Sequence, residues 1–486
     1  MQQKPGTLGA LKESGYQPRS IRDEVRANLL EAIREKRALF PGIVGYDDSV
    51  IPSIVNALLS RHDLLLLGLR GQAKTRICRA IAEFLDEWTP VVDGAPLNDD
   101  PFHPASHFAR TLVQEAGDDT PVSWLHRSAR YQEKLATPDV SMADLIGDID
   151  PIRASRERLD LSDERVIHYG IVPRTNRGLF CLNEIPDLQP RIQVGLLNLL
   201  EERDLQIRGF PIRLELDMIF LFTANPEDYT NRGNIITPLK DRIASQIITH
   251  YPESLEDAMS ITNQEASTDR SVAVHVPDFL RETIEEIAVQ ARLSEHVDQT
   301  SGVSARLAIA ALELLTSSVE RRMVANGDPS ATARLCDLYA LLPAITGKLE
   351  LVYEGEQEGP NIVAERLIGK AVKSIFQEYF PSVHEDKADP DASEPLYGQV
   401  AGWFNAGNTI DVSDKPFSSE LAAQFSGIDG LNELVDSHLE PASPEERLAA
   451  QEFVLEALHQ HSILSREGIG GAVRYGDMLS RMMRDL

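Results

Sequence analysis

Three short runs of continuous apolar residues occur along the chain, and each ends in glycine or in polar residues. The runs are 64–67, 179–182 and 218–222. A strand buried on both faces is continuously apolar, whereas a strand buried on one face alternates between apolar and polar residues. The runs therefore predict parallel strands in a sheet covered by helices on both sides, which is an α/β fold.

Apolar residues at helical spacing indicate the covering helices. Ser20 with Asp23 three residues later has the pattern of a helix N-terminus, and an apolar stripe follows from Val25 to Ile33. A second stripe, from Ile51 to Leu58, leads into the strand at 64–67. Residues 74–184 are more than one strand–helix–strand crossover needs, so we expect an insertion at about 92–170.

Changes in composition divide the chain into five expected segments. The first, 1–40, is an N-terminal helical segment, and 41–255 is an αβα core. Helices are expected over 256–380, where apolar residues at helical spacing in 361–380 predict a packing helix. Residues 381–415 contain several Pro and Asp and are expected to be a linker, and 416–486 a small acidic helical domain.

Composition and charge limit the classes of function. The 486 residues are 42% hydrophobic and carry a net charge of −28, which disfavours general binding to nucleic acid. No apolar run is long enough to span a bilayer and the N-terminus lacks a signal-peptide core, so we expect a soluble, cytoplasmic protein without membrane insertion. The three cysteines lie far apart and are expected to be buried thiols.

The residues after the first strand predict a phosphate-binding loop. Residues 68–75 read GLRGQAKT, in which glycines let backbone N–H groups face an anion, Lys74 supplies a charge, and the Thr75 hydroxyl can bind magnesium. Ala73 replaces the usual glycine before the lysine. An ordinary strand-to-helix turn is the alternative. The residues around Ile43 and Gly45 are candidates to hold a nucleotide base.

Polar residues follow the other two apolar runs. Asn183 and Glu184 end the second run, where nucleotide hydrolysis needs one group to orient magnesium and its waters and a carboxylate to polarise the attacking water. Asn183 lacks the charge for the first task, although its amide oxygen can still accept a hydrogen bond from metal-bound water. Asn225 follows the third run, at the edge of the sheet where ligands bind. Arg242 is a candidate to stabilise charge on a phosphoryl group.

With these segments in order, the chain resembles the AAA+ ATPases. The similarity is to the branch that includes the ATPase subunit of magnesium chelatase and the MoxR-type ATPases. The resemblance covers about residues 40–345, and alanine before the loop lysine is common in that branch. It implies a three-layer αβα core with a parallel sheet, a helical lid and a helical C-terminal extension. The stretch 205–216 resembles the branch's presensor hairpin.

The resemblance also implies roles for single residues. Lys74 would contact the β- and γ-phosphates, Glu184 would be the catalytic base and Asn225 would sense the γ-phosphate. Arg242 resembles an arginine finger that acts on a neighbouring subunit, and Arg306, in the first turn of a helix that Ser304 can cap, resembles the lid's sensor arginine. The implied cofactors are ATP and Mg²⁺. The expected nucleotide-binding residues are Ile43, Gly45, Gly68, Gly71, Gln72, Ala73, Lys74, Thr75 and Arg306, and the expected metal-binding residues are Thr75 and Asn183.

Three functions remain open at this point. The first is an ATP-driven motor, assembled as a homo-oligomeric and by resemblance hexameric ring, that remodels a protein partner carrying a von Willebrand factor A domain. The second is a nucleotide-binding scaffold or switch with weak turnover, because Asn183 stands where the family has an aspartate. The third, a regulator like the σ54 activators, is disfavoured because no helix-turn-helix is evident and the charge is acidic.

Overall fold

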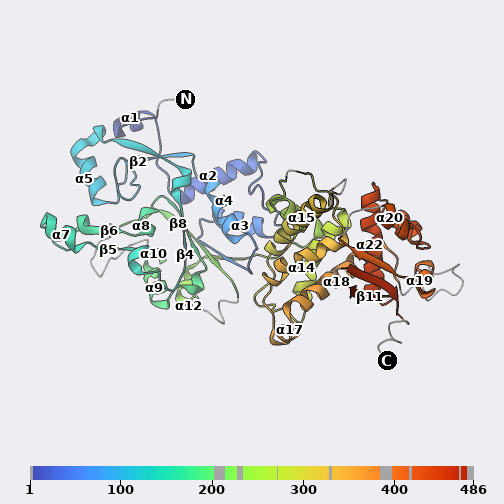
Figure 1. The fold of residues 1–486 in the computed structure, drawn as a ribbon. Coiled ribbons are helices and arrows are strands. Elements are labelled where there is room, and N and C mark those ends of the chain that lie inside the picture. Colours follow the sequence, from blue (N-terminus) through green and yellow to red (C-terminus); the bar gives the residue numbers. More distant parts are fainter. Residues whose placement is uncertain are drawn as a thin grey trace. The chain divides into compact units, whose positions relative to one another are not determined.

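The structure is a computed structural model that describes the chain apart from residues 1–3, 162, 202–213, 227–233, 271, 328–330, 384–396, 415–418, 470–471 and 479–486. The chain divides into two compact units (Figure 1). Unit 1 spans Met1–Tyr251 and unit 2 spans Pro252–Leu486.

A five-stranded parallel sheet forms the centre of unit 1. Its strand order is β4-β7-β8-β1-β9, with bounds Tyr131–Leu135, Gly178–Asn183, Met218–Ala224, Leu64–Leu67 and Ser245–Ile248. The three apolar runs are thus β1, β7 and β8, as predicted. The register pairs Leu67 with Ala224 and Leu182 with Phe222, so the residues that follow these strands meet at one edge of the sheet.

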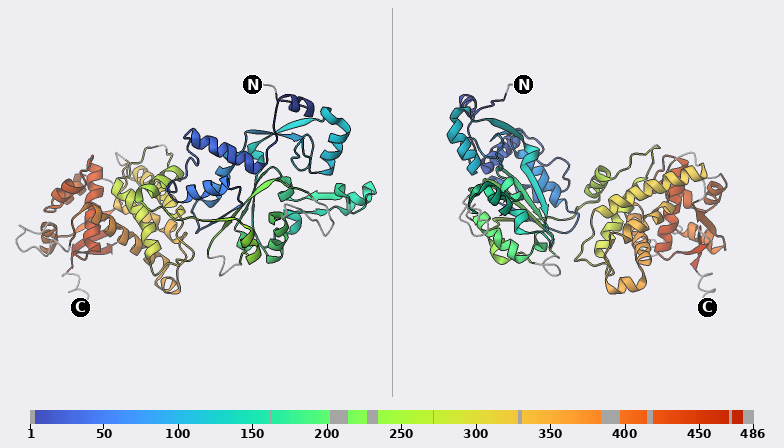
Figure 2. Two further views of the ribbon diagram at one scale, coloured as in Figure 1. Left: turned by 180° about the vertical axis from the view of Figure 1, so that it is seen from behind. Right: turned by 60° about the vertical axis from the view of Figure 1, so that its left-hand side comes forward.

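Helices cover both faces of this sheet, and the strands divide their side chains between them. Leu64 and Leu66 of β1 pack into a cluster with α2 (Ile21–Arg34), α3 (Val50–Leu59) and α4 (Lys74–Ile81). Leu65 packs into the opposite cluster, with Phe180, Phe220 and Phe222 of β7 and β8. The helices on that face include α6 (Met142–Leu145), α8 (Ile171–Arg174), α9 (Pro190–Gly195), α10 (Leu197–Glu201) and α12 (Thr237–Arg242) (Figures 1 and 2). Burial on both faces explains the continuous apolar runs, and the predicted αβα arrangement is confirmed.

The predicted helix start at Ser20 is also present. The Ser20 side chain accepts a hydrogen bond from the Asp23 backbone N–H at 3.2 Å, which satisfies one of the free N–H groups at the start of α2. The second predicted stripe forms α3, whose Ile51, Ile54 and Leu58 face the cluster shared with β1.

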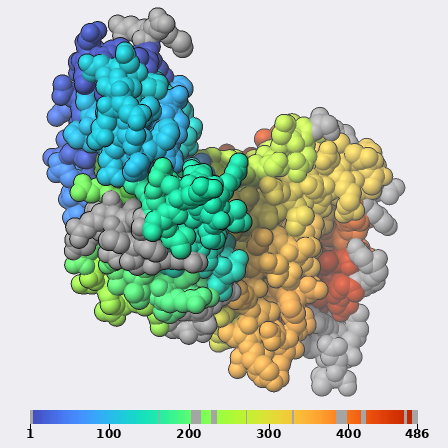
Figure 3. All heavy atoms as spheres, turned by 90° about the vertical axis from the view of Figure 1, so that its left-hand side faces the viewer, coloured from blue at the N-terminus to red at the C-terminus, as the bar shows by residue number. Residues whose placement is uncertain are grey.

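Two additions lie in the part of unit 1 predicted to be one insertion. The first is an antiparallel ribbon of β2 (Trp88–Val92) and β3 (Val122–His126), with α5 (His107–Ala116) between its strands and α1 (Leu8–Glu13) packed against it. The second is the hairpin of β5 (Gly147–Ile149) and β6 (Ile167–Tyr169), which encloses α7 (Pro151–Glu157). Figure 3 shows both additions, in cyan and teal, on one face of unit 1.

A single insertion over about 92–170 is therefore wrong, because β4 lies inside that range and belongs to the central sheet. The sequence Tyr131–Leu135 contains Gln, Glu and Lys and has no apolar run. β4 is an edge strand and its residues are only partly buried, so burial does not require apolar side chains there.

Buried charges fix the amino ends of the strands. The Arg130 guanidinium, just before β4, donates to both Glu24 carboxylate oxygens, at 2.6 and 2.7 Å, and the two side chains are 1% and 4% exposed. Glu24 also accepts the Asp86 backbone N–H at 2.7 Å. Arg22 pairs with buried Asp63, just before β1, at 2.6 Å. These pairs attach α2 to the sheet.

Unit 2 is mainly helical and has one apolar cluster, which extends from Val276 to Tyr475. Its helices are α13 (Leu255–Glu265), α14 (Asp278–Leu293), α15 (Arg306–Asn326), α16 (Leu342–Thr346), α17 (Tyr353–Glu358), α18 (Pro360–Tyr379), α19 (Gly398–Asn405), α20 (Ser419–Ser426), α21 (Leu431–His438) and α22 (Pro444–Gln460). The packing helix predicted over 361–380 is α18. A three-stranded antiparallel sheet completes the unit, in the order β10 (Ile410–Ser413), β12 (Ala472–Asp477) and β11 (Leu464–Ile469).

The C-terminal part of the chain differs from the prediction in two ways. The described part of the expected linker, 381–415, contains α19 and β10, and the expected all-helical segment, 416–486, contributes β11 and β12. Phe404 of α19 and Tyr475 of β12 pack into the same cluster as α14 and α18, so these segments share one core rather than forming a separate domain. The predicted hairpin at 205–216 lies largely outside the described residues.

Among the described residues, we find no helix with the length and apolar character to cross a membrane.

Candidate functional site

The loop between β1 and α4 has the backbone that anion binding requires. Gly71 has a φ of 78° and Ala73 a φ of 56°, and both lie in the left-handed region just before α4 begins at Lys74. Successive left- and right-handed residues turn backbone N–H groups toward one concave side, which an anion can occupy. A left-handed alanine is uncommon, so Ala73 holds a conformation for which glycine is the easier residue.

Close packing fixes the base of this loop. A Cβ atom on Gly68 would overlap the side chains of Thr249 and Gln72, whose Oγ1 and Oε1 atoms form a hydrogen bond of 2.7 Å. The Tyr46 hydroxyl lies within hydrogen-bond distance of the Gln72 carbonyl, at 3.2 Å, and of the His250 carbonyl, at 2.6 Å. Burial raises the pKa of Tyr46 to about 12, so the hydroxyl remains protonated. The end of β9 thus supports the loop.

The Lys74 ammonium lies at the centre of the loop. It donates to the carbonyls of Gly68 and Leu69, the latter at 2.9 Å, and to Asn225 Oδ1 at 2.7 Å. The Asn225 amide in turn donates through Nδ2 to Glu184 Oε2 at 3.0 Å. A continuous chain of hydrogen bonds therefore connects the phosphate-type loop to the carboxylate that follows β7. A phosphate oxygen in the loop would compete with these acceptors for the ammonium.

The Asn183 side chain faces the start of α4. Its Oδ1 accepts from Thr223 Oγ1 at 3.2 Å, from Thr75 Oγ1 at 3.4 Å and from Cys181 Sγ at 3.4 Å. The residue is 9% exposed. The two residues predicted to bind magnesium, Thr75 and Asn183, therefore lie next to each other with oxygen atoms, which is the donor type that Mg²⁺ requires.

Glu184 adopts an unusual backbone conformation. Its φ and ψ are 56° and 50°, a left-handed conformation that disfavours most side chains. Its backbone N–H donates to Thr223 Oγ1 at 3.1 Å. Such outliers persist only where surrounding contacts hold them, and they often mark functional sites.

Two cysteine thiols lie behind the site. Cys78 of α4 and Cys181 of β7 are both fully buried between the helix and the sheet. The neighbouring Cys181 thiol, together with burial, raises the pKa of Cys78 well above its usual range. The prediction of buried thiols is confirmed for Cys78 and Cys181, whereas Cys336 in unit 2 is only partly buried.

Four other predicted site residues lie apart from this chain of hydrogen bonds. Ile43 packs into the apolar cluster of α2 and α3, and Gly45 has a left-handed φ of 77° just before Tyr46. Arg242 ends α12 and its Nε donates to Glu201 of α10 at 2.7 Å. Arg306 begins α15 in unit 2 and its backbone N–H donates to Ser304 Oγ at 3.2 Å, although the N-cap position of the helix is Ala305 rather than the predicted Ser304. None of the four roles is tested by these contacts.

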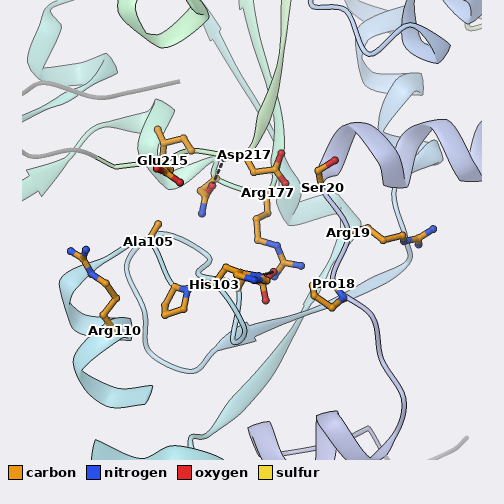
Figure 4. A pocket seen from close by; sticks show the side chains of 13 residues that line it. Pro18, Arg19, Ser20, His103, Ala105, Arg110, Arg177, Glu215 and Asp217 are labelled. Atoms are coloured by element: carbon orange, nitrogen blue, oxygen red, sulfur yellow. Dashed lines mark hydrogen bonds and ion pairs between the residues drawn. The ribbon is translucent and has the colours of Figure 1, made fainter. Parts of the chain in front are cut away.

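A large polar cavity lies at the opposite edge of the sheet (Figure 4). It has a volume of about 670 Å³, and its lining includes Asn176 and Arg177 before β7 and Asp217 before β8. Several of its charged groups already have partners: Arg19 pairs with Asp86 at 2.7 Å, and Asp217 accepts the Ile21 backbone N–H at 2.8 Å. Ligands of parallel sheets bind at the carboxyl ends of the strands, so the loop edge remains the candidate site.

The arrangement at the carboxyl edge fits a nucleotide with magnesium. The loop backbone and Lys74 suit phosphate oxygens, and the Thr75 hydroxyl and the Asn183 amide oxygen suit the metal. Glu184 is the carboxylate of this group and can accept a proton from an attacking water.

Three residues of this site do not appear among the sequence candidates: Tyr46, Thr249 and Thr223. Thr223 could have been found, because a residue two positions before Asn225 in a strand lies on the same face. Tyr46 and Thr249 act through contacts with Gln72 and its neighbours across the fold, and no local pattern indicates them.

Comparisons with known proteins agree with this geometry. Residues 122–243 match the family described as AAA domain (dynein-related subfamily). This range includes Asn183, Glu184 and Asn225 but begins after the loop at 68–75. No curated protein matches the chain.

Two solved structures have low similarity to the chain. A candidate ATPase from Cytophaga hutchinsonii is 16% identical with a TM-score of 0.30, over 74% of this chain and 97% of that one. The complex of subunits BchI and BchD of magnesium chelatase is 18% identical with a TM-score of 0.34, over 66% of this chain and 98% of that one. Neither likeness assigns a fold at these scores. Residues 122–243 therefore resemble an AAA domain, and the parallel sheet covered on both faces agrees with that match.

Proposed function

We propose that the chain is an ATPase that binds ATP with Mg²⁺ at the carboxyl edge of the central sheet and hydrolyses it. The hydrogen-bonded sequence of Lys74, Asn225 and Glu184 is the observation that carries the proposal. The ammonium, the amide and the carboxylate contact one another, which supports the proposal that they bind phosphate and activate water together. The bound magnesium would neutralise phosphate charge and stabilise the charge that develops on transfer.

In this proposal each residue has a task that its surroundings suit. Gly68, Gly71, Gln72 and Ala73 supply the turned backbone, and Lys74 exchanges its carbonyl partners for phosphate oxygens. Thr75 and Asn183 hold the metal. Glu184 accepts the proton of the attacking water, and Asn225 positions that water and the terminal phosphate.

The wider activity follows from the family match as a proposal. AAA domains couple nucleotide turnover to changes between subunits, and we propose a homo-oligomeric ring in which Arg242 of one copy reaches the nucleotide of the next. Its ion pair with Glu201 would then exchange for phosphate. Arg306 would be the sensor arginine that the sequence predicts, and a partner protein with a von Willebrand factor A domain would be the client.

The test compares steady-state ATP hydrolysis by the wild type and Glu184→Gln. We expect the variant to lose about 10²- to 10⁴-fold in kcat, the usual contribution of a general base, while its ATP affinity stays nearly unchanged. Glu215→Gln, an exposed residue of the amino-edge cavity, is the matched control and should keep wild-type turnover. A wild type that binds no ATP, or a Glu184→Gln variant with normal kcat, would contradict the proposal.

One observation favours a second candidate, a nucleotide-controlled switch. Asn183 is neutral where hydrolysis benefits from a carboxylate, so turnover can be slow while binding remains. The same experiment separates the two: equally low rates in wild type and Glu184→Gln, with assembly that depends on ATP, identify the switch.

A further inference from the structure

The Thr223 hydroxyl bridges the two residues that follow β7. It is 1% exposed, it accepts the Glu184 backbone N–H at 3.1 Å, and it donates to Asn183 Oδ1 at 3.2 Å. The register places Thr223 beside Asn183, because Leu182 pairs with Phe222. The sequence analysis assigns Thr223 neither a nucleotide-binding nor a metal-binding role.

The direction of these bonds follows from proton count. A backbone N–H can only donate, so the Thr223 oxygen accepts from Glu184 and its own proton must point elsewhere. Asn183 Oδ1 receives that proton. The Thr75 hydroxyl is a third group at the same oxygen, at 3.4 Å, and also donates to it. Both hydroxyls therefore donate to the amide oxygen, which faces Thr223 and Thr75 in this arrangement.

This orientation matters because an amide has two unlike ends. A carboxylate presents an oxygen whichever way it rotates, so it needs no orienting partner. An amide that rotated by half a turn would present two N–H donors toward Thr75, and metal-bound water, itself a donor, could not bond to them. With asparagine at position 183, the site depends on a neighbour that fixes the side chain.

We infer that Thr223 is a positioning residue that keeps the Asn183 amide oxygen turned toward Thr75 and holds the left-handed backbone of Glu184, and the inference rests on the proposed nucleotide site. Thr223 thereby allows a neutral amide to serve the metal side of the site. The same hydroxyl also accepts the backbone N–H of Glu184, and this bond fixes the backbone that carries the Glu184 carboxylate.

The experiment measures ADP binding with and without Mg²⁺ in four variants. Thr223→Val removes the hydroxyl at nearly constant shape, Thr223→Ser keeps it, and both are compared with Asn183→Asp and with Asn183→Asp/Thr223→Val. Isothermal titration gives the ratio of ADP affinities in Mg²⁺ and in EDTA. Thr283→Val, a fully buried threonine of α14 whose hydroxyl bonds its own helix at 2.6 Å, is the matched control.

We expect Thr223→Val to reduce the gain in affinity from Mg²⁺ by about tenfold, the effect of one lost polar bond, with ADP affinity in EDTA unchanged. Thr223→Ser and Thr283→Val should retain the wild-type ratio. In the Asn183→Asp background the same Thr223→Val change should have little effect on the ratio, because a carboxylate needs no orienting hydroxyl.

Three results would overturn the inference: an unchanged Mg²⁺ ratio in Thr223→Val, an equal loss with and without Mg²⁺, or an equal loss in the Asn183→Asp background. If Thr223→Val does not yield folded protein, Thr223→Ala provides the same comparison. A wild type that binds no ADP under either condition contradicts the proposed function itself, which is a different result from any of the three.

Discussion

At the amino edge of the central sheet, buried arginines form direct ion pairs with carboxylates, whereas at the carboxyl edge a neutral amide lies between a lysine and a glutamate. Before β4 and β1, Arg130 pairs with Glu24 and Asp63 pairs with Arg22. After β1 and β7, the Asn225 amide contacts both Lys74 and Glu184. A charge that holds a neutral partner can exchange it for a ligand at low cost, but a buried ion pair cannot.

The two edges of the sheet therefore differ in their expected roles: the amino edge is structural and the carboxyl edge binds the ligand. The cavity at the amino edge is large and polar, yet several of its charges contact other elements: Asp217 accepts the Ile21 N–H of α2, and Arg177 donates to the Pro90 carbonyl of β2. At the loop edge, Lys74 and Glu184 each contact the Asn225 amide, which a ligand can replace. Four variants test this contrast, from the largest expected effect to the smallest.

The largest effect should come from Glu24→Gln. The change leaves the Arg130 guanidinium buried without its counter-charge, so we expect unit 1 to lose about 3–5 kcal/mol of unfolding free energy. Urea unfolding followed by tryptophan fluorescence measures it, with Trp88 and Trp124 in unit 1. Glu83→Gln, which breaks the more exposed pair with Arg127, is the control and should cost about 0–1 kcal/mol. Similar losses in both variants would remove the contrast.

Lys74→Met should act on binding rather than on stability. The ammonium makes charge-assisted contacts with phosphate, so its loss should weaken ATP affinity by about 10- to 100-fold. Its contacts include two carbonyls and an amide, which are neutral groups, so we expect the thermal midpoint to move little. Titration with ATP measures the effect, and Lys348→Met on the surface of unit 2 is the control. A large fall in stability with unchanged affinity would mean that Lys74 is structural.

Asp217 at the amino edge predicts a pH effect. Burial raises the pKa of its carboxyl above the usual 3.8, with Glu24 adding in the same direction. The native state then keeps a proton that the unfolded chain releases, so this contribution to stability is complete below about pH 3.8 and is lost as pH rises through the raised pKa. Asp217→Asn keeps an acceptor for the Ile21 N–H and removes the titration. Melting temperatures from pH 4 to 7 should fall more in the wild type than in the variant; parallel curves would contradict the assignment.

The smallest effect should come from Arg19→Ala at the rim of the amino-edge cavity. Arg19 and Asp86 are 39% and 30% exposed, and a solvated pair of this kind contributes about 0–1 kcal/mol. Unfolding free energy and ATP affinity should therefore both stay close to the wild type. A marked loss of ATP affinity would show that the amino edge takes part in binding.

The sequence predicted those elements whose signal is local. Four leucines before a glycine loop predicted β1 and the turn into α4, and Ser20 with Asp23 predicted the start of α2, because burial and capping act within a few residues. The edge strand β4 was missed, since a partly buried strand carries no apolar run. The β2–β3 ribbon and the C-terminal sheet depend on pairing between distant segments, which no local pattern encodes.

The same division holds in the candidate site. The residue types of Lys74, Glu184 and Asn225 pointed to their places after β1, β7 and β8, and the register brings them into contact. The supports of the site could not be read in this way. Tyr46 reaches the loop from the segment before α3, and its contacts with the Gln72 and His250 carbonyls exist only once β9 has paired with β1.

The two thiols between α4 and β7 offer an internal reporter of motion. Both are fully enclosed, so an alkylating reagent reaches Cys78 and Cys181 only when the helix separates from the sheet. Their modification rate, resolved by peptide mass, is therefore a measure of how often this part of the fold opens. A ligand that binds across β1, α4 and β7 must lower that rate, and occupancy of the site becomes visible as protection of two sulfur atoms that never touch the ligand.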